Sequence, residues 1–407
     1  MNFDTIDPSL LTVDNQFLLL MSLFSLSESQ KEFARALSGE VSDWEVVFRS
    51  AARNHSLPQL ARNLREIGWP DAARPFQTEV QEAVAQQALQ NLKVVSELRR
   101  FVETCVYPLD INFVVFKGIV LAREFYPDIG LRPCRDIDIA VEPQRFAQLL
   151  RKALQEGYQL YAPNGKGGVL TKEPDIKALL KFARSAVLIS PSGIAIDLQP
   201  GIDKFSGIFA SYDLFDNLKM LDFGGLSLPV MEPEFLFNYI CHHHARHLWS
   251  RLHWLSDVDA LLHAPSFDLR RVRSLAQEFG QLGTVEATLE FHALAAAPER
   301  WGDQTTGRGA EFLRLCLLNL SGDLDLEKRM AMHMMGGEFM FSWQADSDLL
   351  RKARKNWLRT MLQPSFHQYQ FCPLPPAMQW MYYPSRIAQL FSSGLRRLLI
   401  KPPSLNE

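Results

Sequence analysis

The stretch that decides the fold runs from Phe113 to Val141 and reads FVVFKGIVLAREFYPDIGLRPCRDIDIAV. It begins with a short apolar, β-branched run at 113–116, which is typical of a buried strand. The residues that follow, 118–126, predict a helix, and a Pro-Asp-Ile-Gly turn closes it. At 136–141 apolar residues alternate with others, which predicts a second strand. The stretch therefore predicts a strand, a helix, a turn and a strand in succession.

Two carboxylates, Asp136 and Asp138, stand two residues apart on the second strand. Side chains at positions i and i+2 of a strand point to the same face of its sheet. Carboxylates placed side by side repel each other, so the pair contributes little to the fold, and a divalent cation relieves the repulsion. Mg²⁺ prefers oxygen ligands and usually takes one or two carboxylates together with substrate phosphates. The pair therefore predicts a Mg²⁺ (or Mn²⁺) and nucleotide site, unless both carboxylates are merely solvated.

The junction between the first strand and the helix suits the phosphates of such a nucleotide. Lys117 supplies a positive charge, and Gly118 begins a helix whose first backbone N–H groups have no intrahelical acceptor. Helix N-termini bind phosphates because these N–H groups and the helix dipole both attract negative charge. We expect Lys117 and the N–H groups after Gly118 to face the phosphates.

The same stretch resembles a bacterial family of uncharacterised nucleotidyltransferases within the superfamily typified by DNA polymerase β. The positions that match the family pattern are Lys117, Gly118, Leu121, Ala122, Tyr126, Pro127, Gly130, Arg132, Asp136 and Asp138. The wider superfamily has a Gly-Ser phosphate motif, whereas this chain has Lys-Gly, so Lys117 would substitute for the serine hydroxyl. Together with Lys117, Arg132 would neutralise phosphate charge.

A third acid, Asp197, lies on the second strand of a hairpin predicted at 186–190 and 194–199. Polymerase-β-like enzymes place a third catalytic carboxylate on a strand next to the paired acids, and the resemblance implies this role for Asp197. The bacterial family continues here with His and Trp, whereas this chain has Gln199 and Pro200. The alternative is a strand-end Asp that only reaches solvent.

Half of the ten histidines lie at 242–253 on a predicted helix. His243 and His247 have the spacing of a zinc pair, but the zinc-protease signature requires Glu where His244 stands. The bacterial family shows a comparable histidine pair, followed by an acid that corresponds to Asp257. Two interpretations stay open. These residues lie on the acceptor side of the site, or the histidines cap and buttress the packing of the helices.

Length and composition bound the architecture. A chain of 407 residues is long enough for two or three domains, and 47% hydrophobic residues can bury a substantial core. We expect an N-terminal helical region at 1–104, a nucleotidyltransferase core at 105–230 and a C-terminal helical domain at 231–407. The fold class is α+β, and the resemblance implies a polymerase-β-like core with a small mixed sheet.

Charge and cysteine content point to a cytoplasmic protein that does not bind nucleic acid indiscriminately. A net charge of −3 gives no strong sign of nucleic-acid binding. The five cysteines are odd in number and form no C-x-x-C pair, which favours reduced thiols. No run reaches the roughly 18 to 20 apolar residues of a transmembrane helix. A basic amphipathic helix at 384–401 either docks on the protein, which we favour, or lies on a membrane.

The expected activity is metal-dependent transfer of a nucleoside monophosphate from an NTP to an unidentified acceptor hydroxyl or phosphate, with release of pyrophosphate. Asp136, Asp138 and Asp197 would hold the metal, and Asp197 would also ionise or orient the acceptor. A metal-dependent glycosyltransferase is one alternative, because such enzymes also use D-x-D. It ranks low because about 100 helical residues precede the motif where a Rossmann-like half would be expected. A non-catalytic nucleotide-binding or partner module on the same fold is the other alternative.

Overall fold

A computed structural model describes residues 8–163, 168–202, 207–301, 307–320 and 347–399. The described residues form helices and one mixed sheet, which confirms the predicted α+β class. The chain clusters into two compact units, each built from segments far apart in sequence. Unit 1 comprises Met1–Leu89, Leu121–Pro133 and Pro233–Leu350, and unit 2 comprises Gln90–Val120, Cys134–Glu232 and Arg351–Glu407. The domains expected from the sequence were three consecutive ranges. Each of these units instead combines several separate ranges, because the chain passes between the units several times.

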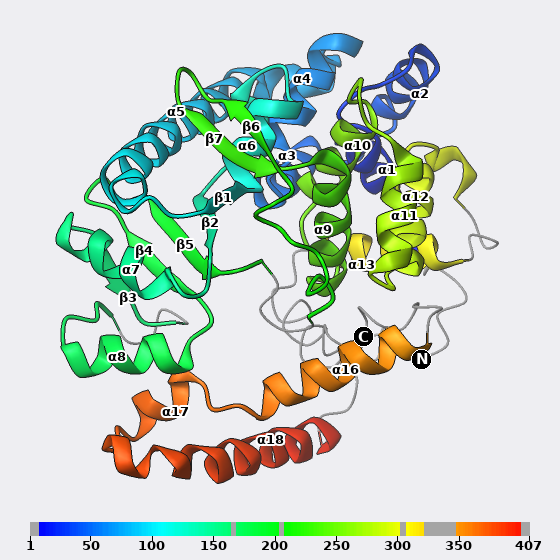
Figure 1. The fold of residues 1–407 in the computed structure, drawn as a ribbon. Helices are drawn as coiled ribbons and strands as arrows, with labels where there is room; N and C mark the ends of the chain where they lie inside the picture. The colour runs from blue at the N-terminus through cyan, green and yellow to red at the C-terminus, as the bar shows by residue number, and fades with distance from the viewer. Residues whose placement is uncertain (1–7, 164–167, 203–206, 302–306, 321–346, 400–407) are drawn as a thin grey trace. The chain divides into compact units, whose positions relative to one another are not determined.

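Unit 2 is centred on a seven-stranded sheet of order β3-β4-β5-β2-β1-β7-β6 (Figure 1). Its strands are β1 Phe113–Phe116, β2 Asp136–Val141, β3 Gln159–Tyr161, β4 Ala186–Ile189, β5 Ala195–Pro200, β6 Leu218–Asp222 and β7 Ser227–Met231. Strands β1 and β2 are antiparallel, β2 and β5 are parallel, and β4 and β5 form the predicted hairpin. All four residues of β1 are buried, so this short apolar run lies in the middle of the sheet.

Strands β6 and β7 were not predicted. They form an antiparallel pair, and β7 lies parallel to β1. Every residue of β6 is at least partly exposed, so the strand lacks the buried alternation that marks a strand in sequence. The available signal was Gly224-Gly225, where both residues adopt the left-handed backbone that a tight turn requires.

The helices of unit 2 flank the sheet and include the C-terminal segment. They are α7 Phe146–Gln155, α8 Glu173–Phe182, α16 Ser347–Leu362, α17 Phe366–Phe371 and α18 Tyr382–Leu399, with a π-helical turn at Val102–Val106. The Tyr369 hydroxyl donates to Asp175 at 2.8 Å, and the rings of Phe182 and Tyr382 meet edge to face at 5.5 Å. These contacts attach α17 and the start of α18 to α8. The last residues of the expected tail helix, 400–401, lie outside the described residues.

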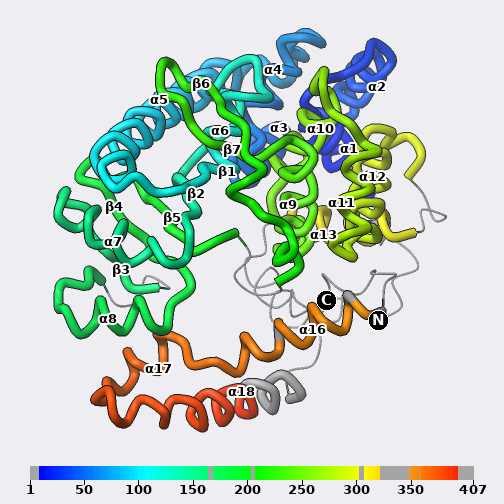
Figure 2. Tube along the Cα trace, in the orientation of Figure 1, coloured from blue at the N-terminus to red at the C-terminus, as the bar shows by residue number. Residues whose placement is uncertain are grey.

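Unit 1 is a helical assembly in which the N-terminal helices pack against those that follow the sheet. Its helices are α1 Val13–Leu20, α2 Glu28–Ser38, α3 Trp44–Arg53, α4 Leu57–Ile67, α9 Pro233–Arg246, α10 His253–Leu262, α11 Leu269–Glu278, α12 Leu282–Ala295 and α13 Arg308–Leu320. Two further helices are divided between the units: α5 Gln77–Phe101 runs from unit 1 into unit 2, and α6 Gly118–Phe125 runs from unit 2 into unit 1. Helices α1 and α12 are in contact although far apart in sequence (Figure 2). None of the described helices is both long and apolar enough to cross a bilayer.

Local sequence explains why α3 forms and which face it buries. Asp43 caps the helix by accepting the backbone N–H of Val46 at 3.0 Å. Apolar residues recur at three- and four-residue spacing, and the same residues are buried: Trp44, Val47, Phe48 and Ala51. The Trp44 ring meets the edge of Phe17 of α1 at 5.2 Å between centroids. Burial of this aromatic pair joins α1 to α3.

A buried carboxylate at the end of α10 gives unit 1 a pH dependence. The Asp259 carboxylate accepts from His292 Nε2 at 2.6 Å and from the Ser25 backbone N–H at 3.1 Å, and His263 Nδ1 lies 3.3 Å away. Burial alone raises the pKa of Asp259, but hydrogen bonds from His263 and His292 outweigh it and bring the pKa to about 2. The hydrogen bond to Asp259 raises the pKa of His263 from 6.5 to about 9.

We therefore expect unit 1 to lose stability between pH 6.5 and pH 9. The folded-state pKa of His263 is raised, so its contribution is fully present below about pH 6.5 and is lost as the pH rises through about 9. The loss is modest because the imidazole is half exposed and water screens the charge. Urea unfolding at several pH values measures it. His263→Gln should flatten the dependence in this window, and an unchanged slope would contradict the assignment.

Candidate functional site

A strained turn joins β1 to α6 and lies against the start of β2. Lys117 and Gly118 both have left-handed backbones, with φ of 60° and 39°. A Cβ on Gly118 would lie 3.4 Å from the carbonyl oxygen of Asp136, so glycine suits both the conformation and the close approach. For a lysine this backbone is unusual, and such conformations cluster where a binding site requires them.

The lysine of this turn forms an ion pair with a carboxylate of β2. Lys117 Nζ lies 2.8 Å from Asp138 Oδ1, and only 17% and 8% of the two side chains are exposed. Strand pairing explains the contact, because Phe116 is opposite Asp138 in the β1–β2 ladder. The ammonium of Lys117 therefore offsets the negative charge of Asp138 in the structure.

The register of β2 and β5 brings the predicted acids to one face of the sheet. Asp138 and Asp197 are direct partners in this parallel pair. Asp136 is two residues before Asp138 on the same face, and its side chain is exposed. Gln199 Nε2 donates to Asp197 Oδ2 at 2.7 Å and reaches Asp138 Oδ1 at 3.4 Å. We call Lys117, Asp136, Asp138, Asp197 and Gln199 the carboxylate cluster.

Gln199 is the member of the cluster to which the sequence assigned no role. It is buried, and its amide connects the carboxylates of two neighbouring strands. Burying polar groups is favourable only when they are hydrogen-bonded, and the amide donates to one carboxylate oxygen of each acid. The signal for Gln199 in the sequence was its position two residues after Asp197, because side chains two residues apart on a strand point to the same face.

The cluster suits a divalent cation that also binds substrate phosphates. Within the part of the chain that the structure describes, no three His, Cys, Asp or Glu side chains are grouped to hold a metal ion. Mg²⁺ usually needs only one or two protein carboxylates, because it keeps waters and takes phosphate oxygens. Asp138 and Asp197, adjacent in register, fit this requirement. The participation of Asp136 stays a prediction.

Arg132 belongs to unit 1, whereas Lys117 and Gly118 belong to unit 2. Its Nε and Nη2 donate to the two carboxylate oxygens of Asp257 at 2.7 and 2.8 Å, and the Tyr126 hydroxyl donates to Asp257 at 2.8 Å. Arg132 and Asp257 are 6% and 0% exposed. Burial, and secondly the charge of Asp257, raise the pKa of Tyr126 well above its ordinary value.

The ion pair between Arg132 and Asp257 is a structural contact within unit 1. The bidentate pair engages both carboxylate oxygens and two guanidinium nitrogens. Two residues of the sequence motif, Tyr126 and Arg132, thus hold α10 to the segment after α6. The expected contacts of Arg132 with phosphate and of Asp257 with the acceptor stay predictions that this arrangement does not support.

The histidines of α9 lie in an aromatic group within unit 1. His243 and His247 have ring centroids 4.6 Å apart. His244 is buried and stacks on Trp254 at 4.7 Å with an interplanar angle of 5°. Burial lowers the pKa of nearby His253 well below its ordinary value. These contacts agree with the packing interpretation, and a contact of His243 or His247 with an acceptor stays a prediction.

Comparison with known proteins points to one family. Residues 40–295, more than half of the chain, match the model of a family described as uncharacterised nucleotidyltransferase. Among solved structures, a similar chain is an antigenic nucleotidyltransferase-like protein from Paracoccidioides brasiliensis. It is 11% identical, with 53% of this chain and 93% of that chain covered and a TM-score of 0.30, too low to support an argument. No curated protein matches.

Proposed function

The chain belongs to this uncharacterised nucleotidyltransferase family, and we propose that it uses the carboxylate cluster to transfer a nucleoside monophosphate from an NTP. The acceptor would be a hydroxyl or phosphate oxygen. One observation carries the proposal. Asp138 and Asp197 are partners on neighbouring strands, next to the phosphate-sized turn at Lys117 and Gly118. The two acids, the ammonium group of Lys117 and the N-terminus of α6 lie together at this point of the sheet.

Asp138 and Asp197 would hold Mg²⁺ or Mn²⁺, with Asp136 as a third ligand at the exposed end. When bound, such an ion neutralises phosphate charge and stabilises the entering and leaving oxygens of an in-line displacement. The substrate would contribute further oxygen ligands. This accounts for two neighbouring acids on strands whose alternate residues, such as Ile137 and Ile139, are apolar and buried.

The residues of the cluster would have separate tasks. Lys117 would leave Asp138 for the phosphates once the carboxylate has another positive partner, and the N–H groups at the start of α6 would bind beside it. Gln199 would keep Asp197 oriented through its hydrogen bond. Asp197 would accept the proton of the acceptor hydroxyl as the new oxygen–phosphorus bond forms and the bond to pyrophosphate breaks.

Lys117→Met should weaken NTP binding by about 1.5 to 3 kcal/mol, because it removes a charge-assisted hydrogen bond to phosphate. Isothermal titration with an NTP and Mn²⁺ measures the change. Lys152→Met is the matched control, because Lys152 also lies in unit 2 but pairs with Glu156 on α7. Equal NTP affinity in wild type and Lys117→Met would show that the ammonium does not bind phosphate.

The activity is tested by incubating the full-length protein with each α-labelled NTP and Mg²⁺ or Mn²⁺. Release of pyrophosphate and transfer of label are measured with sugar phosphates, hydroxyl-bearing small molecules, RNA ends and the protein itself as acceptors. We expect at least one NTP to give both signals, and Asp197→Asn to give neither. If wild type releases no pyrophosphate with any NTP and acceptor, the proposal fails.

A further inference from the structure

Exposed large apolar side chains gather in the C-terminal part of unit 2. Among the residues that the structure describes, 15 such side chains are exposed, and nine of them belong to α16, α17, the 3₁₀ turn Pro376–Met381 and α18. Single exposed apolar residues are ordinary, whereas a group of them marks an interaction site. The nine are Leu358, Leu362, Phe371, Met378, Trp380, Met381, Tyr383, Ile387 and Phe391.

Part of this group forms a stripe along α18. Tyr383, Ile387 and Phe391 are four residues apart, so they lie on one face of the helix. Trp380 stands three residues before Tyr383, in the turn that leads into the helix. The side chains of Trp380 and Phe391 are 67% and 70% exposed, so the stripe presents most of its aromatic surface to solvent. We call these four residues the apolar stripe.

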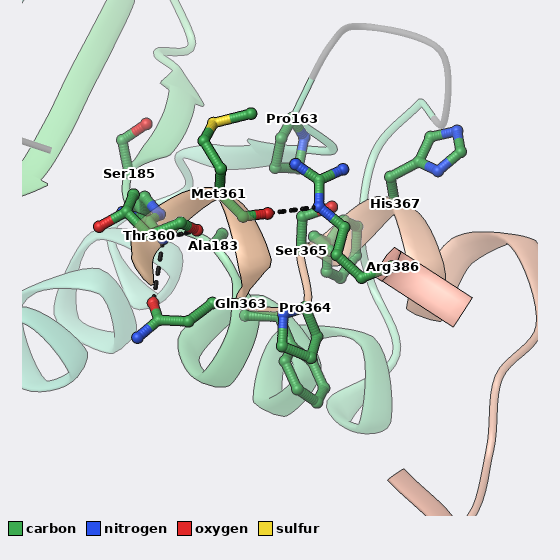
Figure 3. Close-up of a pocket in the computed structure, with 13 residues that line it drawn as sticks. Pro163, Ala183, Ser185, Thr360, Met361, Gln363, Pro364, Ser365, His367 and Arg386 are labelled. Atoms are coloured by element: carbon green, nitrogen blue, oxygen red, sulfur yellow. Dashed lines mark hydrogen bonds between the residues drawn. The ribbon is translucent and has the colours of Figure 1, made fainter. Parts of the chain in front are cut away.

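Other residues attach α18 to the rest of unit 2. Tyr382 is buried, and its ring meets that of Phe182 edge to face. Arg386 Nε donates to the Met361 carbonyl at 2.9 Å, which holds α18 to the end of α16 (Figure 3). Docking on the protein therefore accounts for the face that carries Tyr382 and Arg386, and it leaves the apolar stripe exposed.

The segment that carries the stripe is strongly basic. Residues 349–406 contain nine of the 43 Lys and Arg residues of the chain and none of its 46 Asp and Glu residues, although the net charge of the whole chain is −3. Four of these basic side chains are exposed on α16: Lys352, Arg354, Lys355 and Arg359. The segment is therefore complementary in charge to an anionic surface.

Basic and apolar side chains also share the exposed surface of α16. Lys355 stands three residues before Leu358, and Leu362 four residues after it, so the three are neighbours along the helix. All three side chains are exposed. A lysine in this setting can lay its apolar stem along a hydrophobic surface and keep its ammonium at a polar boundary.

An anionic lipid bilayer matches both the charge and the apolar stripe. Its headgroups attract Lys and Arg, its acyl boundary takes up apolar side chains, and Trp and Tyr favour the level between the two. We propose that the apolar stripe of α18 lies on the surface of an anionic membrane, with the basic residues of α16 at the lipid headgroups. This site is independent of the proposed nucleotidyl transfer.

Two other occupants match the surface less well. RNA would satisfy the basic residues and would stack on Trp380, but it offers no apolar environment to exposed aliphatic side chains such as Ile387 and Leu358. A second copy of the chain would cover the stripe, but its own basic segment would be brought against the first. Only the membrane satisfies both features.

The probe is a set of lipid vesicles, and binding of the full-length protein is measured by cosedimentation. One set contains phosphatidylcholine alone, and in the other about a third of this lipid is replaced by phosphatidylglycerol. We expect binding to the anionic vesicles to be at least about tenfold tighter, and to weaken as the salt concentration rises.

The apolar contribution is tested with Ile387→Ser combined with Phe391→Ser. This variant should bind the anionic vesicles at least about tenfold more weakly, because it removes apolar surface from the stripe. Leu89→Ser with Leu92→Ser is the matched control, because both leucines are exposed on α5. It should bind the vesicles as wild type does.

The basic contribution is tested with Lys352→Gln combined with Lys355→Gln. We expect weaker binding to the anionic vesicles, by about tenfold or more, and a smaller dependence on salt. Arg270→Gln with Arg271→Gln removes the same number of exposed charges from α11 in unit 1 and should bind as wild type does. Circular dichroism without vesicles verifies the fold of each variant.

The proposal is overturned if wild type binds neither set of vesicles, or both equally. It is also overturned if the variant at Ile387 and Phe391 binds the anionic vesicles as wild type does, and Trp380→Ser provides a second test if that variant does not fold. Binding of single-stranded RNA, or a concentration-dependent dimer, in the absence of vesicle binding would overturn it by identifying a different occupant.

Discussion

Asp138→Asn is expected to lower nucleotidyl transfer about a thousandfold, equivalent to roughly 4 kcal/mol of transition-state stabilisation. Among the proposed metal ligands, Asp138 is buried, has Asp197 as its strand partner and has its Oδ1 2.8 Å from Lys117 Nζ. Asparagine keeps the size of the side chain but removes the charge that would hold the cation. Single-turnover transfer of label from the preferred NTP measures the effect.

Stability separates this loss from misfolding. Asp138→Asn removes the carboxylate that lies 2.8 Å from the partly buried ammonium of Lys117, so we expect a lower Tm for that variant. Asp136→Asn is the control, because Asp136 is exposed and its replacement should leave Tm unchanged. The sequence predicted only repulsion between the two acids, and the ion pair with Lys117 corrects this for Asp138. Activity within tenfold of wild type in folded Asp138→Asn would contradict its role.

Asp257→Ala should destabilise the protein by about 3 to 5 kcal/mol. The substitution leaves the guanidinium of Arg132 buried without a counter-charge and removes the acceptor of the Tyr126 hydroxyl. A loss of this size is a large part of the roughly 5 to 15 kcal/mol that stabilises a typical domain. Urea unfolding followed by circular dichroism measures it. If Asp257→Ala does not fold, Asp257→Asn provides a milder variant of the same contact.

Two controls show that the loss comes from the buried pair. Glu173→Ala breaks the exposed pair with Arg151 and should cost no more than about 1 kcal/mol. The double variant Arg132→Met with Asp257→Leu should be more stable than Asp257→Ala, because it removes both buried charges. A loss below about 1 kcal/mol in Asp257→Ala would show that the pair contributes little.

Local pattern predicted the elements that carry the carboxylate cluster. The apolar run of β1, the Lys-Gly junction and the alternation in β2 each lie within a few residues, and the structure forms them where expected. The hairpin of β4 and β5 followed from Pro191, Ser192 and Gly193 in the same way. The family resemblance added the placement of Asp197 next to β2, and the register confirms that placement.

Contacts between distant residues were not predictable from the sequence. Arg132 and Asp257 are 125 positions apart, and no local pattern shows that this arginine meets a buried acid of α10. Which segments make up each of the two units could not be predicted for the same reason, because each unit joins segments separated by more than 100 residues along the chain.

If Asp138 and Asp197 form a metal and nucleotide site, crystals of the protein with Mn²⁺ and a non-hydrolysable NTP analogue should show the ion there by its anomalous scattering. We expect a Mn²⁺ peak about 2.1 Å from oxygens of both acids and of the triphosphate, with Lys117 Nζ moved from Asp138 to a phosphate. A nucleotide bound elsewhere, or a triphosphate bound at this turn without a metal on either acid, would contradict it.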